Sequence, residues 1–456
     1  MVMGTATSMA TPPDAPYRVL SRVQAAHLAV ERNLDLLVAR AGPRLAALQV
    51  HVSWRPFVPV ATLESGVRRV DGDESADDSL DYRAHLSWSL PTGTVLSATA
   101  NGTEPVADAS ESTGALDLSL TQALRKGNAS GAGHPLREAE LALRVERVRF
   151  EKAVEDLLLE VERAYWGLAV AQANVETKKR SVERAQRQYE VTAENIRRGI
   201  KPQGDIYFVE GSLVSFREQL MRSDEQLHLA RRTLARLLDL PADTLLSASA
   251  PLAGVGATIP GGLDPTESPV HRLVVLEAER RTLQRRFEEN QAASRLDLKA
   301  TFALRGDAEN PWDDVLAAEG ADGRIGLTWA VPLLPGSDNA RVQKAQIEVE
   351  RQAGRVAVSA QRVRVSAGDI ALRLEGQGER LVLAEKQVEL ARKALANAKD
   401  QFKNGVSTLN EVVRFQERLD GSMIAAQQAI VDLRIRRAEL LQAHGALRDD
   451  LEVRVK

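Results

Sequence analysis

The sequence contains no cysteine among its 456 residues. Disulfide bonds, thiolate metal sites, cysteine nucleophiles and a lipid-anchored cysteine are therefore excluded. Aromatic residues make up only 4% of the chain, which is a poor supply for base-stacking platforms. The net charge is −3, so no overall basic field points to a nucleic-acid partner.

Long apolar runs are also absent from the sequence. No stretch approaches the roughly 18 to 20 residues that a membrane-spanning helix needs. Residues 1–20 lack the basic segment followed by an apolar segment that is typical of a secretory signal. Barrel strands give a far weaker signal than helices, so a membrane location through strands stays open.

Residues that could carry catalysis or hold a metal are scattered along the chain. None of the seven histidines lies at metal-ligand spacing from another histidine. Gly254 and Gly256 lie in a stretch rich in proline and glycine, without the strand and helix of a dinucleotide site. We therefore expect a protein that is not an enzyme and that holds no cofactor and no metal.

An apolar repeat of 3.5 residues runs along two long segments. From Phe150 to Ile196 the apolar positions lie alternately four and three residues apart, and the pattern resumes from Ile206 to Leu237. A sustained period of this kind is typical of helices that pack along a supercoiled seam. Gly199 and Pro202 interrupt the pattern once, which predicts one long antiparallel helical hairpin.

The same hairpin pattern occurs a second time, displaced by the interval from Gly199 to Gly405. Its arms run from Val356 to Phe402 and from Val412 to Ala443. Two registers at one fixed offset indicate an internal duplication. The seams are interpreted as packing surfaces, and we expect the polar residues that interrupt them to set the register of the helices. These residues are Lys178, Gln377 and Arg436.

Alternation of apolar and polar residues predicts strands before each hairpin. In the first half, for example, Leu86 and Trp88 fall on one face and Ser87 on the other. The strands are about 9 to 11 residues long, enough to span a bilayer at a tilt, and their polarity suits a barrel with a wet lumen. We expect lipid to contact Leu86, Trp88, Leu298 and Phe302, and the lumen to contact Ser87 and Lys299.

The sequence thus predicts the same order of elements in each half of the chain: helix, strand, polar loop, strand and helical hairpin. Two strands per half cannot close a sheet, so copies of the chain must pool their strands in a homo-oligomer. The predicted order is a disordered lead-in (1–16), a first repeat (17–240), a linker (241–267), a second repeat (268–447) and a tail (448–456). In the first repeat we expect strands at about 82–100 and 115–123 and the hairpin at 136–240. In the second repeat we expect strands at about 295–305 and 324–332 and the hairpin at 338–445.

In this arrangement the chain resembles the TolC family of outer-membrane efflux and secretion channels, from Leu20 to about Leu447. The opening helix, the strand-to-helix junctions and the hairpin turns each resemble the family's pattern. The first junction departs from it, because Ala123 stands where the second keeps Pro332. The matching segments are LSLTQALRKG (118–127), IGLTWAVPLLPG (325–336), GIKPQGDI (199–206) and GVSTLNEV (405–412).

The resemblance implies an α+β membrane protein in which three copies share a twelve-stranded barrel in the outer membrane. The barrel would continue into a periplasmic α-helical barrel. It also implies an exit channel of a tripartite efflux pump or a type I secretion system, with a periplasmic adaptor and an inner-membrane transporter as partners. The adaptor-contacting tips would be Gly199, Ile200 and Lys201 in the first hairpin and Gly405, Val406 and Ser407 in the second.

The resemblance further implies an acidic pore constriction just beyond each turn. The matching residues are Asp205 and Glu411, and the nearby Arg414 can pair with Glu411 at i, i+3 on a helix. A simpler alternative is that both acids favour a helix N-terminus, where carboxylates oppose the helix dipole. Two other functions stay open: a soluble coiled-coil scaffold, which the strands disfavour, and a periplasmic adaptor, which would not duplicate the hairpin.

Overall fold

The computed structural model divides the chain into two compact units. The first comprises Met1–Ala41, Arg149–Arg272 and Ser359–Lys456, and the second Gly42–Val148 and Leu273–Val358. The predicted lead-in, most of the predicted linker, Lys201 and Gly405 lie outside the described residues. The structure describes residues 17–71, 76–106, 112–200, 202–249, 252, 264–308, 311–318, 321–333, 336–404 and 406–453.

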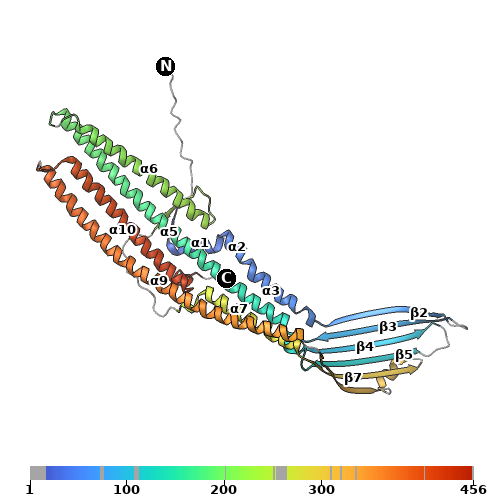
Figure 1. The fold of residues 1–456 in the computed structure, drawn as a ribbon. Coiled ribbons are helices and arrows are strands. Elements are labelled where there is room, and N and C mark those ends of the chain that lie inside the picture. Colours follow the sequence, from blue (N-terminus) through green and yellow to red (C-terminus); the bar gives the residue numbers. More distant parts are fainter. Residues whose placement is uncertain are drawn as a thin grey trace. The chain divides into compact units, whose positions relative to one another are not determined.

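Two helical hairpins dominate the first unit (Figure 1). The first pairs α5 (His134–Arg197) with α6 (Asp205–Leu237), and the second pairs α9 (Gly336–Lys403) with α10 (Leu409–Ala443). Helices α5 and α9 also extend into the second unit, as does α7 (Pro269–Ala292). Within the described ranges, no helix has both the length and the apolar character needed to cross a membrane. The shorter helices of the first unit are α1 (Arg22–Arg32), α2 (Leu34–Ala39), η2 (Pro265–Glu267) and α11 (Leu447–Asp450).

A short parallel pair of strands also belongs to the first unit. Strand β1 (Tyr17–Leu20) pairs with β6 (Leu245–Ala248). The sequence predicted only a linker over 241–267, which is wrong for β6. Four residues without a strong alternation give no strand signal of their own, and β6 forms because β1 supplies its hydrogen-bonding partner.

The core of the first unit contains a buried ionic network around Trp166. Its indole Nε1 donates a hydrogen bond of 2.7 Å to Glu162, and the Arg434 guanidinium lies 4.2 Å from the ring centroid. Glu162 also pairs with Arg22 at 3.1 Å. Burial raises the pKa of the Glu162 carboxyl, and the Arg22 charge and the Trp166 hydrogen bond oppose that shift. Because Asp450 also binds Arg22, the network joins α1, α5, α10 and α11.

The second unit contains one antiparallel sheet of six strands in the order β2-β3-β4-β5-β7-β8. Strands from both halves of the sequence meet where β5 pairs with β7 (Figure 1). The helices outside the sheet are α3 (Ala41–Ser53), η1 (Arg55–Phe57), α4 (Ala129–Ala132) and α8 (Pro311–Ala317). The strands are β2 (Val60–Asp71), β3 (Ala76–Ser89), β4 (Thr94–Pro105), β5 (Ser112–Ala123), β7 (Arg295–Ala308) and β8 (Asp322–Ala330).

The sequence predicted four strands for this sheet, and in the described residues it has six. The predicted strand over 82–100 is a hairpin, because the chain reverses at Gly93 (φ +83°) and the Leu90 N–H bonds the Thr94 carbonyl at 2.8 Å. Strand β2 was not predicted at all. Ser65 and Arg69 stand on its apolar face, so its alternation is too weak to recognise.

The strand register sorts the side chains of the sheet into one apolar and one polar face. One cross-strand row on the apolar face contains Leu86, Ala98, Leu118 and Phe302, each opposite the next. The polar face is tied by side-chain bonds between neighbouring strands. They include Ser97 to Ser119 at 2.7 Å, His85 to Thr99 at 2.8 Å and Arg83 to Asn101 at 3.1 Å.

Three glycines form a cross-strand row on the apolar face. The row lies near the end of the sheet at which β4 is followed by the loop to β5. Gly102, Gly114 and Gly306 lie opposite one another on β4, β5 and β7. A Cβ atom at Gly102 would lie 2.1 Å from the Tyr82 ring, so only glycine lets that ring lie flat on the sheet. Helix α8 covers the other two glycines, and its Trp312 donates a 3.0 Å hydrogen bond to the Tyr82 hydroxyl.

Glu155 on α5 is buried with only one of its carboxyl oxygens satisfied. Oε1 accepts the Arg448 backbone N–H at 3.2 Å, and Oε2 has no partner. Burial raises the pKa of Glu155 from 4.5 to about 7, against the opposing effect of the Arg448 and Leu447 backbone N–H groups. The group therefore contributes stability below pH 4.5 that is lost as the pH rises towards 7.

We predict that Glu155→Gln removes this pH dependence. At pH 8 the variant should be more stable than the parent, by up to ~3 kcal/mol, because no buried charge has to form. At pH 4.5 the two should be nearly equal. Chemical unfolding in detergent between pH 4.5 and 8 measures the difference, and Glu160→Gln, at an exposed position of the same helix, is the control. Parallel pH profiles for parent and Glu155→Gln would contradict the prediction.

Candidate functional site

The first hairpin tip closes with a Schellman motif at the end of α5. The Gly199 N–H bonds the Ile196 carbonyl at 2.9 Å, and the Ile200 N–H bonds the Asn195 carbonyl at 2.9 Å. Gly199 has φ +73°, a conformation that glycine adopts without a steric penalty. The tip geometry is therefore fixed by local backbone bonds.

The second tip repeats the same bond. The Val406 N–H bonds the Gln401 carbonyl at 2.9 Å, and these two residues correspond to Ile200 and Asn195 in the first hairpin. Helix α10 then begins after Thr408, whose hydroxyl accepts the Glu411 backbone N–H at 3.3 Å. The first tip has no such cap, because Gly204 precedes α6.

Each tip exposes one aliphatic side chain. Ile200 is 67% exposed and Val406 is 78% exposed. In a Schellman motif this residue commonly packs against the side chain at the position of Asn195 or Gln401. Both of those residues are polar amides, so neither offers an apolar side chain to the aliphatic residue at its tip.

The two acidic residues beyond the turns occupy the first turns of their helices. Asp205 is the first residue of α6, and Glu411 is the third of α10. The Glu411 carboxylate accepts the Ser407 hydroxyl at 2.8 Å, and within the described residues no ion pair joins it to Arg414. The expected pairing at i, i+3 is thus not formed, because Glu411 is turned back towards the cap.

A groove of about 370 Å³ lies between the two hairpins, near the tips. All four long helices contribute to its walls. Apolar side chains such as Phe216 and Val412 line it together with the basic residues Arg184, Arg187 and Lys399. The groove therefore combines an apolar wall with positive charge.

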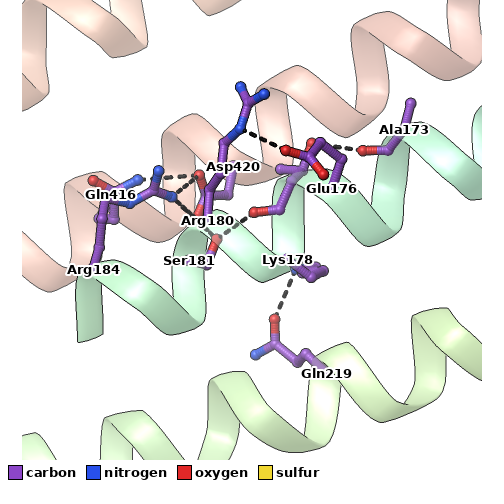
Figure 2. Close-up of polar contacts among 10 residues, drawn as sticks. Ala173, Glu176, Lys178, Arg180, Ser181, Arg184, Gln219, Gln416 and Asp420 are labelled. Carbon is purple, nitrogen blue, oxygen red and sulfur yellow. Dashed lines mark hydrogen bonds and ion pairs between the residues drawn. The ribbon is translucent and has the colours of Figure 1, made fainter. Parts of the chain in front are cut away.

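A buried carboxylate joins the two hairpins beside this groove. Asp420 on α10 is 3% exposed and accepts hydrogen bonds from Ser181 at 2.6 Å, Arg184 at 2.8 Å and Gln416 at 3.0 Å. Ser181 and Arg184 are on α5, so the cluster spans the two sequence repeats (Figure 2). A buried charge is tolerated only when it is paired and hydrogen-bonded, and these three donors meet that condition.

The polar residues that interrupt the seams take three different roles. Lys178 donates a 2.7 Å hydrogen bond to Gln219 and so joins α5 to α6 (Figure 2). Gln377 donates to the Ala429 carbonyl at 3.4 Å and joins α9 to α10. Arg436 instead pairs within its own helix, with Glu439. Two of the three therefore make contacts that can set the register between hairpin arms.

The four residues expected to contact lipid lie on one face of the sheet. Leu86 and Phe302 belong to one cross-strand row, and Trp88 and Leu298 are two and four residues away from it on the same face. Leu86 is 47% exposed and Phe302 is 42% exposed. Ser87 and Lys299, expected in the lumen, lie on the opposite face. Among the described residues, no group of three or more histidine or acidic side chains could hold a metal ion.

Sequence comparison identifies one family. Residues 25–239 match the model of the outer membrane efflux protein family. No curated protein matches the chain.

The fold is similar to several solved structures along nearly its whole length. One is the outer membrane protein VceC of Vibrio cholerae, with 17% identity, a TM-score of 0.62 and coverage of 94% of this chain and 95% of that one. Another is the MtrE outer membrane channel of Neisseria gonorrhoeae, with 15% identity, a TM-score of 0.63 and coverage of 93% and 89%. A membrane protein from Pseudomonas aeruginosa gives 14% identity, a TM-score of 0.66 and coverage of 97% of both chains.

We predict that the Asp420 cluster couples the two hairpins energetically. Asp420→Ala should lower the free energy of unfolding by ~3 kcal/mol, because Ser181 and Arg184 lose their buried partner. In a double-mutant cycle, Arg184→Ala combined with Asp420→Ala should cost ~1–3 kcal/mol less than the sum of the single changes. Denaturant unfolding followed by circular dichroism gives these values, with the exposed Glu417→Ala as control. Additive costs would show that the cluster carries no coupling.

Proposed function

We propose that this chain is an outer membrane efflux protein, the family whose model residues 25–239 match, and that its copies form an exit channel. The channel carries substrates from an inner-membrane pump across the periplasm and the outer membrane. The observation that carries the proposal is the six-stranded sheet, which has one apolar and one polar face. Such a sheet suits a barrel with lipid outside and water inside.

The helical hairpins supply the wall of a periplasmic tunnel in this proposal. Helix α5 has 64 residues, which at 1.5 Å per residue gives a length of ~96 Å along its axis. That length suits a periplasmic crossing. A scaffold made only of coiled coils would have no use for an apolar sheet face, so the sheet disfavours that alternative.

A periplasmic adaptor protein is the proposed partner at the tips. Ile200 and Val406 each present an exposed aliphatic side chain at a hydrogen-bonded turn, and the groove between the hairpins adds basic residues. Together they suit a helical partner that has an apolar stripe with acidic flanks. Lys201 and Gly405, also expected at the tips, lie outside the described residues.

Extraction and labelling test the channel proposal. The protein should require detergent and should elute as a homotrimer by light scattering. Because the chain has no cysteine, an introduced cysteine is the only thiol that can be labelled. Lys299→Cys should react with a water-soluble maleimide in outer-membrane vesicles, and Leu298→Cys, one residue away on the apolar face, should be protected. A water-soluble monomer, or the reverse labelling pattern, would sink the proposal.

The proposed constriction makes a separate prediction about ion selectivity. Three copies of Glu411 around one axis would attract cations, and Arg414, one helical turn further, would offset part of their charge. In planar bilayers Glu411→Ala should reduce the cation preference, and Arg414→Ala should increase it. Ser407→Ala serves as a control, since it removes the hydroxyl bonded to Glu411 but no charge. If neither charge change alters selectivity or conductance, Glu411 is only a helix-capping residue.

A further inference from the structure

The groove between the two hairpins collects positive charge. Arg184 and Arg187 of α5 and Lys399 of α9 line it, and none of the described residues in its walls is acidic. Elsewhere on α5 cations pair with acids one turn away, as Arg180 does with Glu176 at 3.1 Å. The walls of the groove therefore favour a negatively charged group and repel a positively charged one.

The three cations keep hydrogen-bond donors that the described part of the chain does not use. Arg184 binds Asp420 through Nη2 at 2.8 Å (Figure 2), but its buried Nε–H has no acceptor among the described residues. Within the same residues, the side chain of neither Arg187 nor Lys399 forms an ion pair or a hydrogen bond. A buried donor without an acceptor is costly, so an anion that reaches these groups gains contacts that the protein alone lacks.

Apolar side chains form another part of the groove wall. Val209 and Phe216 of α6 are buried, and Leu409, Val412 and Val413 of α10 continue this surface. The volume of about 370 Å³ lies within the ~300–1,000 Å³ that is typical of sites for small organic molecules. Such sites combine an apolar lining with a few polar groups that orient the ligand, and the groove has both.

The cations of the groove come from both hairpins. Arg184 and Arg187 are three residues apart on α5, so they lie on one face of the first hairpin. Lys399 is on α9 and therefore belongs to the second hairpin. One acid group that binds Arg187 and Lys399 together would connect the two sequence repeats.

We propose that this groove is a binding site for a small amphipathic organic anion. Its acid group, a carboxylate, sulfate or sulfonate, binds Arg187 and Lys399 and reaches the Nε–H of Arg184. Its apolar body lies against Phe216 and Val412. The bound anion bridges the two hairpins and stabilises their alignment. This inference concerns the hairpins alone and does not depend on the proposed channel.

A fluorescent probe tests the site on the full chain, held in a non-ionic amphipol so that micelles and lipid are absent. Anilinonaphthalenesulfonate carries one sulfonate on an apolar ring system, and it should bind the parent saturably with a rise in fluorescence. Arg187→Gln combined with Lys399→Gln should weaken this binding ~10-fold or more, because two charge-assisted contacts are lost. Arg184 is left in place, since its removal would also disturb Asp420. Phenylnaphthylamine, the same ring system without the sulfonate, should bind both proteins equally.

Two further variants separate the possible outcomes. Arg392→Gln, at an exposed position of α9 outside the groove, should keep the parent's affinity for the sulfonate. Val412→Trp, which fills the apolar wall, should weaken binding without removing a charge, and far-UV circular dichroism checks that each variant is folded. Binding that is unchanged by Arg187→Gln with Lys399→Gln would overturn the inference, and so would the absence of saturable binding to the parent. Either result leaves the proposed channel standing, because extraction and labelling test it separately.

Discussion

Backbone hydrogen bonding across the six-stranded sheet stops at β2 on one side and at β8 on the other. In a bilayer, an unpaired N–H or C=O group costs several kcal/mol, so an open edge is not tolerated there. The apolar face of the same sheet is costly to leave in water. Both costs are removed if several copies close a barrel in a membrane, and this requirement underlies the proposed assembly.

The helical unit combines two kinds of contact with different consequences. Apolar seams hold the two arms of each hairpin together, and such contacts tolerate small shifts because they have no direction. The contacts of Asp420 with Ser181 and Arg184 are directional and buried, so they favour one alignment of the two repeats. The buried ionic network around Trp166 aligns α1 and α11 in a similar way, because Arg22 of α1 pairs with Glu162 of α5 and with Asp450 of α11. Specific alignment thus depends on a few buried charges.

The hairpin tips show how a local motif can expose an aliphatic side chain. Ile200 and Val406 are each held by a backbone bond to the last turn of a helix, and at the first tip Gly199 has the left-handed conformation. Their exposure follows from the polar residues Asn195 and Gln401 at the usual packing position.

Local patterns in the sequence determined the hairpins and much of the sheet. The 3.5-residue seam and Gly199 located the first tip, because helix packing and the left-handed turn depend on nearby residues. The alternation around Leu86 and Phe302 assigned these side chains to one face for the same reason. Glu411 was recognised only as an acid near a helix start, and its bond to Ser407 required the coordinates.

The remaining features depend on residues far apart in the chain. Strand β2 pairs along β3 although its own alternation is weak, and β6 forms only beside β1. Asp420 and Ser181 are 239 residues apart, so no spacing rule could connect them. Only the tertiary structure decided the number of strands, the identity of the two edges and the buried contact between the repeats. Each of these features depends on which distant segments come into contact. The interaction energy of such a contact depends on both segments, so neither segment's sequence predicts it alone.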